Sequence, residues 1–321
     1  MALNRIVVLV GGVGGAKLAH GLAQILEPER LTIIVNTGDD FWHYGLRVCP
    51  DLDTVLYTLS GLVDPVNGWG IAGDTAHMLE ALRRYGEEGW FRLGDRDLAT
   101  HLLRTMWLRQ GRTLTQVMDE LRARLGVPQR LLPMTDAEVA TVVDTVEHGE
   151  LEFQTYFVRY RWQPVATAIR YRGLEGASVS EDVARAIGEA DAILFGPSNP
   201  WLSIAPILSV PGMRELLLAR DVPRVALSPI IEGNAVKGPA AKLMAELGYE
   251  PSAAAVARYY GDLINGYVFD ERDAGLNIPV ARATTFDTLM KTQADRARLA
   301  GQMLDWINSW GRNESLGDHP G

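Results

Sequence analysis

The sequence predicts an α/β protein built around a mostly parallel sheet, with helices on both faces. Continuous apolar and β-branched runs alternate with amphipathic helical patterns along most of the 321 residues. Strands that are buried on both faces have such runs, and their alternation with helices indicates parallel strands. Glycine-rich or polar loops follow several of the runs, which is where open α/β sheets bind ligands.

The first half of the chain is predicted to be mainly helical after two strands. We expect strands at 5–10 and 31–35 and helices at 16–26, 52–63, 75–86, 95–110 and 113–125. Glycines at or just after the ends of the last three helices favour these boundaries. We interpret residues 1–321 as one domain with a mainly helical insertion at about 75–126.

The second half returns to alternation after a region rich in β-branched residues. We expect strands at 139–146, 165–171, 192–195 and 224–227, and helices at 180–190, 211–219, 239–247, 252–260 and 287–310. The pattern contains no internal repeat and no low-complexity tract.

Composition excludes several classes of function. The chain carries 31 basic and 40 acidic residues, a net charge of −9, so we expect no nucleic-acid partner, because phosphate binding needs a basic surface. The one cysteine, Cys49, excludes an intrachain disulfide and a thiolate zinc site and favours a reducing compartment. The apolar run at 6–10 is too short for a signal peptide or a membrane span. We therefore expect a cytoplasmic protein with no membrane partner.

The loop after the first strand contains four glycines, Gly11, Gly12, Gly14 and Gly15, followed by Lys17. Such a turn lets backbone N–H groups and a helix N-terminus approach an anion, so it predicts a phosphate or nucleotide site. A tight turn without a ligand is the alternative. Lys17 is not followed by Ser or Thr, as in a Walker A loop, and it stands where a dinucleotide site has its third glycine.

Acidic residues follow the second predicted strand. Asp39 and Asp40 come directly after it, and Asp51 and Asp53 precede the next helix. Carboxylates clustered beside a phosphate loop favour a bound cation, and Mg²⁺ is the natural one. The alternative is that Asp51 or Asp53 merely caps the helix.

Polar loops also follow two later strands. Pro197, Ser198 and Asn199 come after the strand at 192–195, and Lys237 lies just before the helix at 239–247. Each group is either a ligand contact or an ordinary turn or surface residue. Arg92 is a candidate contact for an anion or a ring.

Nine motifs occur in an order that resembles one protein family. They are GGVGGAK (11–17), NTGDD (36–40), CPDLDTVLYTLSGLVD (49–64), GWGIAGDT (68–75), LGDRDLATHL (93–102), LPMTD (132–136), GPSNPWLSIAPIL (196–208), SPIIEGNAVKGPAAKLM (228–244) and FDERD (269–273). On these motifs the chain is similar to the CofD/FbiA family, the 2-phospho-L-lactate and phosphoenolpyruvate transferases of coenzyme F420 biosynthesis. Val13 stands where many archaeal members have Thr, so backbone N–H groups must supply any phosphate contact there.

The resemblance implies a Rossmann-like core and a Mg²⁺-dependent phosphotransferase. The donor would be a guanosine diphosphate that carries a three-carbon acid on its distal phosphate. The acceptor would be the ribityl hydroxyl of the deazaflavin Fo, and GMP would leave. Family members are often dimers, so the resemblance also implies a homodimer.

The resemblance implies that Asp53 and Arg92 contact the deazaflavin. Within the acidic cluster, Asp39 and Asp51 are the candidates for metal ligand and general base, and the sequence does not separate these two roles. The residues implied for the guanosine diphosphate are Gly11, Gly12, Gly14, Gly15, Lys17, Pro197, Ser198, Asn199 and Lys237.

Three alternatives stay open at this point. The donor carries enolpyruvate, lactate or glycerate, and the amino-acid sequences of the motifs favour enolpyruvate. A nucleotide-sugar-binding regulator of the related YvcK type shares the glycine loop, but the intact PDLDT and GPSNP motifs argue against it. An NAD-dependent oxidoreductase is disfavoured by Asn36, where a ribose-binding Asp or Glu is expected.

Overall fold

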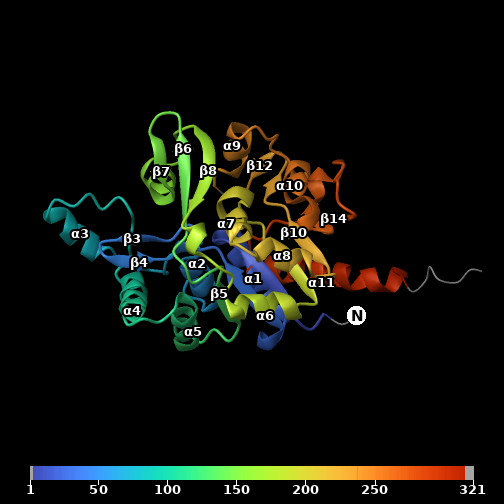
Figure 1. Cartoon of the computed structure of the whole chain (residues 1–321), viewed down its shortest axis with the longest axis horizontal. Coiled ribbons are helices and arrows are strands. Elements are labelled where there is room, and N and C mark those ends of the chain that lie inside the picture. Colours follow the sequence, from blue (N-terminus) through green and yellow to red (C-terminus); the bar gives the residue numbers. More distant parts are fainter. Residues whose placement is uncertain (1–2, 237, 315–321) are drawn as a thin grey trace, which may run out of the picture.

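A seven-stranded sheet forms the centre of the computed structural model, which describes residues 3–236 and 238–314 (Figure 1). Its strand order is β14-β13-β10-β9-β1-β2-β5, and every neighbouring pair is parallel. The strands are β1 (Ile6–Val10), β2 (Leu31–Val35), β5 (Arg130–Pro133), β9 (Ala192–Phe195), β10 (Arg224–Leu227), β13 (Gly266–Asp270) and β14 (Arg282–Phe286). The predicted fold class is confirmed.

Helices cover both faces of this sheet. They are α1 (Val13–Ile25), α2 (Pro50–Leu59), α3 (His77–Arg84), α4 (Asp97–Arg109), α5 (Leu114–Arg124), α6 (Glu181–Glu189), α7 (Ala205–Ser209), α8 (Met213–Leu218), α9 (Ala240–Glu246), α10 (Ala253–Tyr260) and α11 (Gln293–Glu314). Along β1, Ile6, Val8 and Val10 pack into one core with α1, α2, α5 and α11. Val7 and Leu9 pack into a second core with α6, α8 and α10, because successive side chains of a strand point to opposite faces.

Three smaller β structures stand outside the main sheet. They are the hairpin β3 (Phe41–His43) and β4 (Leu46–Val48), the antiparallel sheet β7 (Gly149–Glu152), β6 (Ala140–Thr145) and β8 (Ala166–Arg172), and the hairpin β11 (Ile230–Ile231) and β12 (Asn234–Ala235). The first hairpin turns through Tyr44 and Gly45, both with positive φ, as a two-residue hairpin loop requires. A π-helical turn, η2 (Thr155–Arg159), lies between β7 and β8.

The block at about 75–126 contains α3, α4 and α5. Helix α5 and the end of α4 contribute Leu114, Val117 and Trp107 to the first core. Helix α3 buries only Leu79 and lies at the edge of the molecule (Figure 1). That the chain is one domain with a helical insertion stays a prediction. Within the described residues, no helix is long and apolar enough to cross a membrane.

The observed elements differ from the expected ones in two places that matter for the site. Helix α1 begins at Val13 rather than residue 16, so part of the glycine loop forms its first turn. Helix α11 begins at Gln293 rather than residue 287, because the Asp295 carboxylate accepts hydrogen bonds from the backbone N–H groups of Lys291 and Thr292 and so caps the helix there. Residues 287–292 are consequently a loop.

Candidate functional site

A cavity of about 810 Å³ opens at the carboxyl ends of the central strands. Strand β1 pairs with β2 on one side and with β9 on the other, so the connections diverge at this point of the sheet. Open α/β sheets bind their ligands at such a switch point. The volume is within the range of small-molecule sites.

The structure brings most of the sequence-predicted residues to this one cavity. Its lining includes Gly12, Gly14, Lys17, Asp39, Asp51, Asp53, Arg92, Pro197, Ser198 and Asn199. Gly11 and Gly15 lie behind the lining, and the N–H of Gly11 donates to Ser198 Oγ over 2.9 Å. Lys237 is outside the described residues, although Val236 and Gly238 line the cavity.

The loops after β1 and β9 pack directly against each other. A Cβ on Gly14 would lie 2.6 Å from the carbonyl oxygen of Pro197, and a Cβ on Gly15 would lie 2.7 Å from Ser198 Oγ. Any larger residue would therefore separate the loops. Lys17 crosses from α1 to the loop after β14, where its Nζ donates to the Met290 carbonyl over 3.0 Å. The site is thus built from three strand ends.

Asp39 and Asp51 form a buried acid pair against the glycine loop. Asn36 Nδ2 donates to Asp51 Oδ2 over 2.9 Å. Burial raises the pKa of Asp51 to about 6, although that hydrogen bond acts in the opposite direction. Burial, followed by the Asp51 charge, raises the pKa of Asp39 well above its ordinary value. Two carboxylates in this arrangement repel each other unless a proton or a cation is shared between them.

The acid pair fits a hard cation. Asp39 Oδ1 is buried and has no hydrogen-bond partner among the described residues, and a buried polar atom without a partner is costly. Carboxylate oxygens are the ligands that Mg²⁺ prefers, usually one or two of them together with phosphate oxygens. Asp39 and Asp51 are therefore the residues that would hold Mg²⁺.

Substituting Gly12 is expected to displace the acid pair. A Cβ at Gly12 would lie 2.5 Å from Asp51 Oδ1. Because that atom ends a side chain, the carboxylate can shift while the fold stays intact. We expect Gly12→Ala to lower kcat about 10-fold or more, since a displacement of 1 Å at a reacting centre can cost 10²-fold, with a small change in Tm. Gly188→Ala on α6, where a Cβ meets no atom within 4 Å, is the control. Equal turnover of the two variants would contradict the placement of Asp51.

Asp53 belongs to a different network from Asp51. The carboxylate of Asp53 forms a bidentate ion pair with Arg104, whose side chain is fully buried on α4. Arg104 Nη1 also donates to His101 Nδ1 over 3.2 Å, and His101 Nε2 lies 3.3 Å from Asp97 Oδ2. Tyr57 OH donates to Asp97 Oδ1 over 2.6 Å. Charge and hydrogen bonds thus fix the carboxylate of Asp53 at the cavity wall.

This network is a poor metal site despite its ligand types. The ligand atoms of Asp53, Asp97 and His101 lie within 4.8 Å of one another. However, the lone pair of His101 Nδ1 and both oxygens of Asp53 accept from Arg104, and a guanidinium ion cannot be deprotonated. A cation would have to displace a buried positive charge. Asp53 and its partners therefore form a hydrogen-bonding wall, which suits a polar organic group better than a metal.

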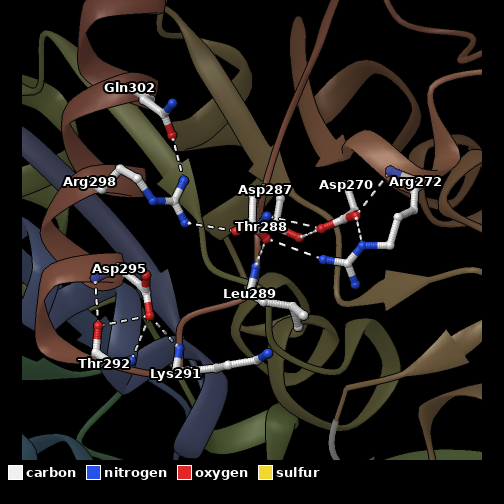
Figure 2. Close-up of polar contacts among 10 residues, drawn as sticks. All are labelled: Asp270, Arg272, Asp287, Thr288, Leu289, Lys291, Thr292, Asp295, Arg298 and Gln302. Carbon is white, nitrogen blue, oxygen red and sulfur yellow. Dashed lines mark hydrogen bonds and ion pairs between the residues drawn. The ribbon is translucent and has the colours of Figure 1, made fainter.

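The loop after β14 forms the opposite end of the cavity. Thr288, Leu289, Met290 and Lys291 line it, together with Ser228 and residues 238–240. Figure 2 shows how this loop is fixed: the fully buried carboxylate of Asp270 accepts from Thr288 N over 3.0 Å and from Thr288 Oγ1 over 2.7 Å. Arg272 bridges Asp270 and Asp287. The sequence predicted a helix from residue 287, so this loop was not expected. Asp270 and Arg272, which hold the loop, belong to the FDERD motif at 269–273.

The remaining wall is aromatic. It was not predicted from the sequence, which placed no cavity residues between 150 and 165. Its rings are Trp69, Trp90, Phe91, Phe153, Phe157 and Trp162. The cavity therefore combines the glycine loop, the loop after β9, a buried acid pair, a fixed carboxylate and an apolar wall. A few placed polar groups beside an apolar wall are typical of small-molecule sites.

The chain is similar to a known protein family and to several named proteins. The family described as 2-phospho-L-lactate transferase CofD matches residues 6–305. A Streptomyces griseus protein named phosphoenolpyruvate transferase is 48% identical over 276 residues, covering 84% of this chain and 87% of that protein. A Methanosarcina mazei protein named 2-phospho-L-lactate transferase is 42% identical over 298 residues, covering 92% of this chain and 97% of that protein.

A solved structure has a similar fold. The crystal structure of a UPF0052 family member from Bacillus halodurans aligns with a TM-score of 0.61 at 15% identity, covering 95% of this chain and 99% of that chain. At this identity the likeness shows the fold alone. It agrees with the predicted Rossmann-like α/β core.

Proposed function

Because the chain belongs to the 2-phospho-L-lactate transferase CofD family, we propose that it transfers a phosphorylated three-carbon acid in coenzyme F420 biosynthesis. The donor is a guanosine diphosphate that bears phosphoenolpyruvyl or 2-phospho-lactyl. The acceptor is the ribityl hydroxyl of the deazaflavin Fo, and GMP is released. The observation that carries the proposal is the buried Asp39–Asp51 pair, which lies against the glycine loop in the cavity lining.

The sheet order supports two substrates that meet at this pair. The loops after β10 and β14 lie on one side of the β1–β9 switch point, and the loops after β2 lie on the other. We assign the first side to the guanosine, and the glycine loop, the loop after β9 and Lys17 to the diphosphate. The second side, with Asp53 and Arg92, takes the deazaflavin. The acid pair then lies between the phosphoryl group and the hydroxyl that attacks it.

The residues of the chain provide positioning and charge. Backbone N–H groups of the glycine loop and the N-terminus of α1 bind the diphosphate oxygens. Mg²⁺ held by Asp39 and Asp51 would supply the charge neutralisation on which phosphoryl transfer mainly depends. A carboxylate bound to Mg²⁺ is a poor base, so a member of the pair accepts the proton of the attacking hydroxyl only where it does not itself ligate the ion. Asp53, fixed by Arg104, orients the acceptor.

We propose phosphoenolpyruvyl as the preferred donor group. The Streptomyces griseus relative, named phosphoenolpyruvate transferase, is 48% identical, and the Methanosarcina mazei relative, named 2-phospho-L-lactate transferase, is 42% identical. The test is a turnover assay with the purified protein, Mg²⁺ and Fo. Separate reactions contain the enolpyruvyl, the lactyl or the glyceryl donor. A phosphodiester product with GMP supports the reaction, and the fastest donor identifies the group. A folded protein that forms no product from any donor would contradict the proposal.

The stability of the metal-free protein is expected to depend on pH through the acid pair. Raised folded-state pKa values mean that the native protein keeps protons which the unfolded chain releases above about pH 4. The stabilisation is therefore complete below pH 4 and is lost as the pH rises through the folded pKa of Asp51, about 6, and through the raised folded pKa of Asp39. We expect the Tm to fall from pH 5 to pH 7.5, and Mg²⁺ to raise it more at pH 7.5 than at pH 5.

Comparison with a variant isolates this effect, because other carboxylates also titrate. Asp51→Asn removes one member of the pair, so its Tm should fall less between pH 5 and pH 7.5 than that of the wild type. It should also gain less Tm from Mg²⁺. Differential scanning calorimetry measures both differences. Identical pH profiles for the two proteins would show that the acid pair does not contribute to the pH dependence of the Tm.

A further inference from the structure

We propose that two aromatic arms hold the planar ring of the acceptor between them, an inference that rests on the proposed function. The first arm is Trp90 and Phe91, in the loop that precedes α4. The second arm is Phe157 and Trp162, in the turn between β7 and β8. All four rings line the cavity. The arms explain how an acidic site attracts a flat heterocycle, which the acid pair cannot do.

The first arm is supported from behind by the β3–β4 hairpin. Phe41 meets Phe91 edge-on with ring centroids 4.8 Å apart, and His43 meets Trp90 edge-on at 5.4 Å. Trp90 and Phe91 are themselves 5.7 Å apart and nearly perpendicular. Edge-to-face packing of this kind fixes ring orientation. Trp90 and Phe91 are half-buried, and Arg92 continues the arm into the cavity lining.

The segment that carries the second arm, residues 153–162, faces the cavity along most of its length. Six of the ten residues between 153 and 162 line the cavity, namely Phe153, Gln154, Phe157, Val158, Arg161 and Trp162. Phe153 and Phe157 stack at 5.2 Å, and Phe157 contacts Trp162 at 5.1 Å. The backbone here includes a π-helical turn, a feature that often occurs at functional sites.

The end of the second arm has a left-handed backbone. Arg161 and Trp162 have φ values of 51° and 48°, in the left-handed region that ordinarily favours glycine. Both are the central residues of a tight turn, which the backbone N–H of Gln163 closes by donating to the Tyr160 carbonyl over 3.1 Å, and such a turn requires positive φ at both positions. The turn brings the indole of Trp162 and the guanidinium of Arg161 into the cavity lining.

Two contacts place the second arm at the acceptor end. Arg159 forms an ion pair with Glu88 at 2.7 Å, which joins the second arm to the loop of the first. Gln154 Nε2 donates to the backbone oxygen of Asp39 over 3.1 Å, which ties the start of the arm to the acid pair. The arms therefore meet on the side of the cavity that holds Arg92. A planar ring between them would gain stacking on its faces.

Replacing Trp162 by glycine tests the arm without straining the fold. Trp162→Gly removes the indole, and glycine accepts the left-handed backbone, so we expect the Tm to be kept or raised. We expect the Kd for Fo to rise at least about fivefold, the lower end of what the loss of one stacked ring costs. The Kd for GDP with Mg²⁺ should be unchanged. Trp162→Phe should restore most of the affinity, because a ring is again present.

Glu232→Gly is the matched control. Glu232 has a φ of 49°, close to the 48° of Trp162, it is exposed, and it is absent from the cavity lining. Fo binding is followed through its own absorbance without donor, and GDP binding by calorimetry. Equal Fo affinities for wild type, Trp162→Gly and Glu232→Gly would overturn the aromatic arms while leaving the transferase proposal intact. A wild-type protein that binds GDP but not Fo would overturn both.

Discussion

Replacing either member of the acid pair, as Asp51→Asn or as Asp39→Asn, is expected to lower kcat about 100-fold or more while the protein stays folded. Each substitution removes a charge that would bind Mg²⁺ or accept the proton of the attacking hydroxyl, and the loss of either function typically costs at least this much. The measurement is turnover of Fo with saturating donor and Mg²⁺. The amide keeps the shape of the side chain, so the cavity should be unchanged.

Stability distinguishes this loss from unfolding. Burial disfavours the charged form of both carboxylates, so an amide in either place should keep or raise the Tm of the metal-free protein at pH 7.5. Asp305→Asn, on an exposed position of α11, is the control and should change neither turnover nor Tm. Near-wild-type turnover in both acid-pair variants would overturn the assignment of the catalytic centre.

The candidate site could be predicted from sequence wherever its residues directly follow strands. The glycine loop, the acidic residues after β2 and Pro197–Asn199 after β9 occupy consecutive strand ends, and parallel strands bring such ends to one edge of the sheet. The structure places these loops in contact, with Gly14 against Pro197 and Gly12 against Asp51. That part of the site is a consequence of topology, so a strand pattern was enough to find it.

The rest of the site depends on contacts between distant segments. The aromatic arms come from 90–91 and from 157–162, and neither segment follows a strand of the main sheet. The loop at 287–291 depends on Asp270, which is 18 residues away from Thr288. A helical pattern runs through this loop in the sequence, but buried hydrogen bonds from a neighbouring strand determine its conformation. Tertiary contacts of this kind routinely override local helix propensity.

Three strands of the main sheet, β5, β13 and β14, were not predicted from the sequence. Strand β5 is four residues long and ends at Pro133, and β14 is only partly buried. Neither therefore shows the long apolar run that marks a central strand. Strand β13 is buried throughout but includes glycine and aspartate, both depleted in strands. The carboxylate of Asp270, at the end of β13, holds the loop at 287–291. An aspartate that is unfavourable in a strand is therefore explained by its contact with the site.

Arg104→Met is expected to destabilise the protein by about 3–5 kcal/mol, the usual cost of removing one partner from a buried ion pair. Arg104 is fully buried, and its guanidinium pairs with Asp53 and donates to His101. Methionine fills much of the volume but leaves a buried carboxylate without its counter-charge. Urea unfolding at pH 7.5 measures the change. Arg5→Met, which breaks a 2.7 Å ion pair with Glu189 on the surface, should cost less than about 1 kcal/mol.

The double variant Asp53→Asn/Arg104→Met separates stability from binding. It removes both charges together, so much of the lost stability should return, as it does when a whole buried pair is replaced. The affinity of the double variant for Fo should stay below that of the wild type, because the proposed acceptor contact needs the carboxylate of Asp53. A double variant as unstable as Arg104→Met would show that packing, rather than the unpaired charge, accounts for the loss. Restored Fo affinity would show that Asp53 serves Arg104 alone, and that the network supports the fold rather than the acceptor.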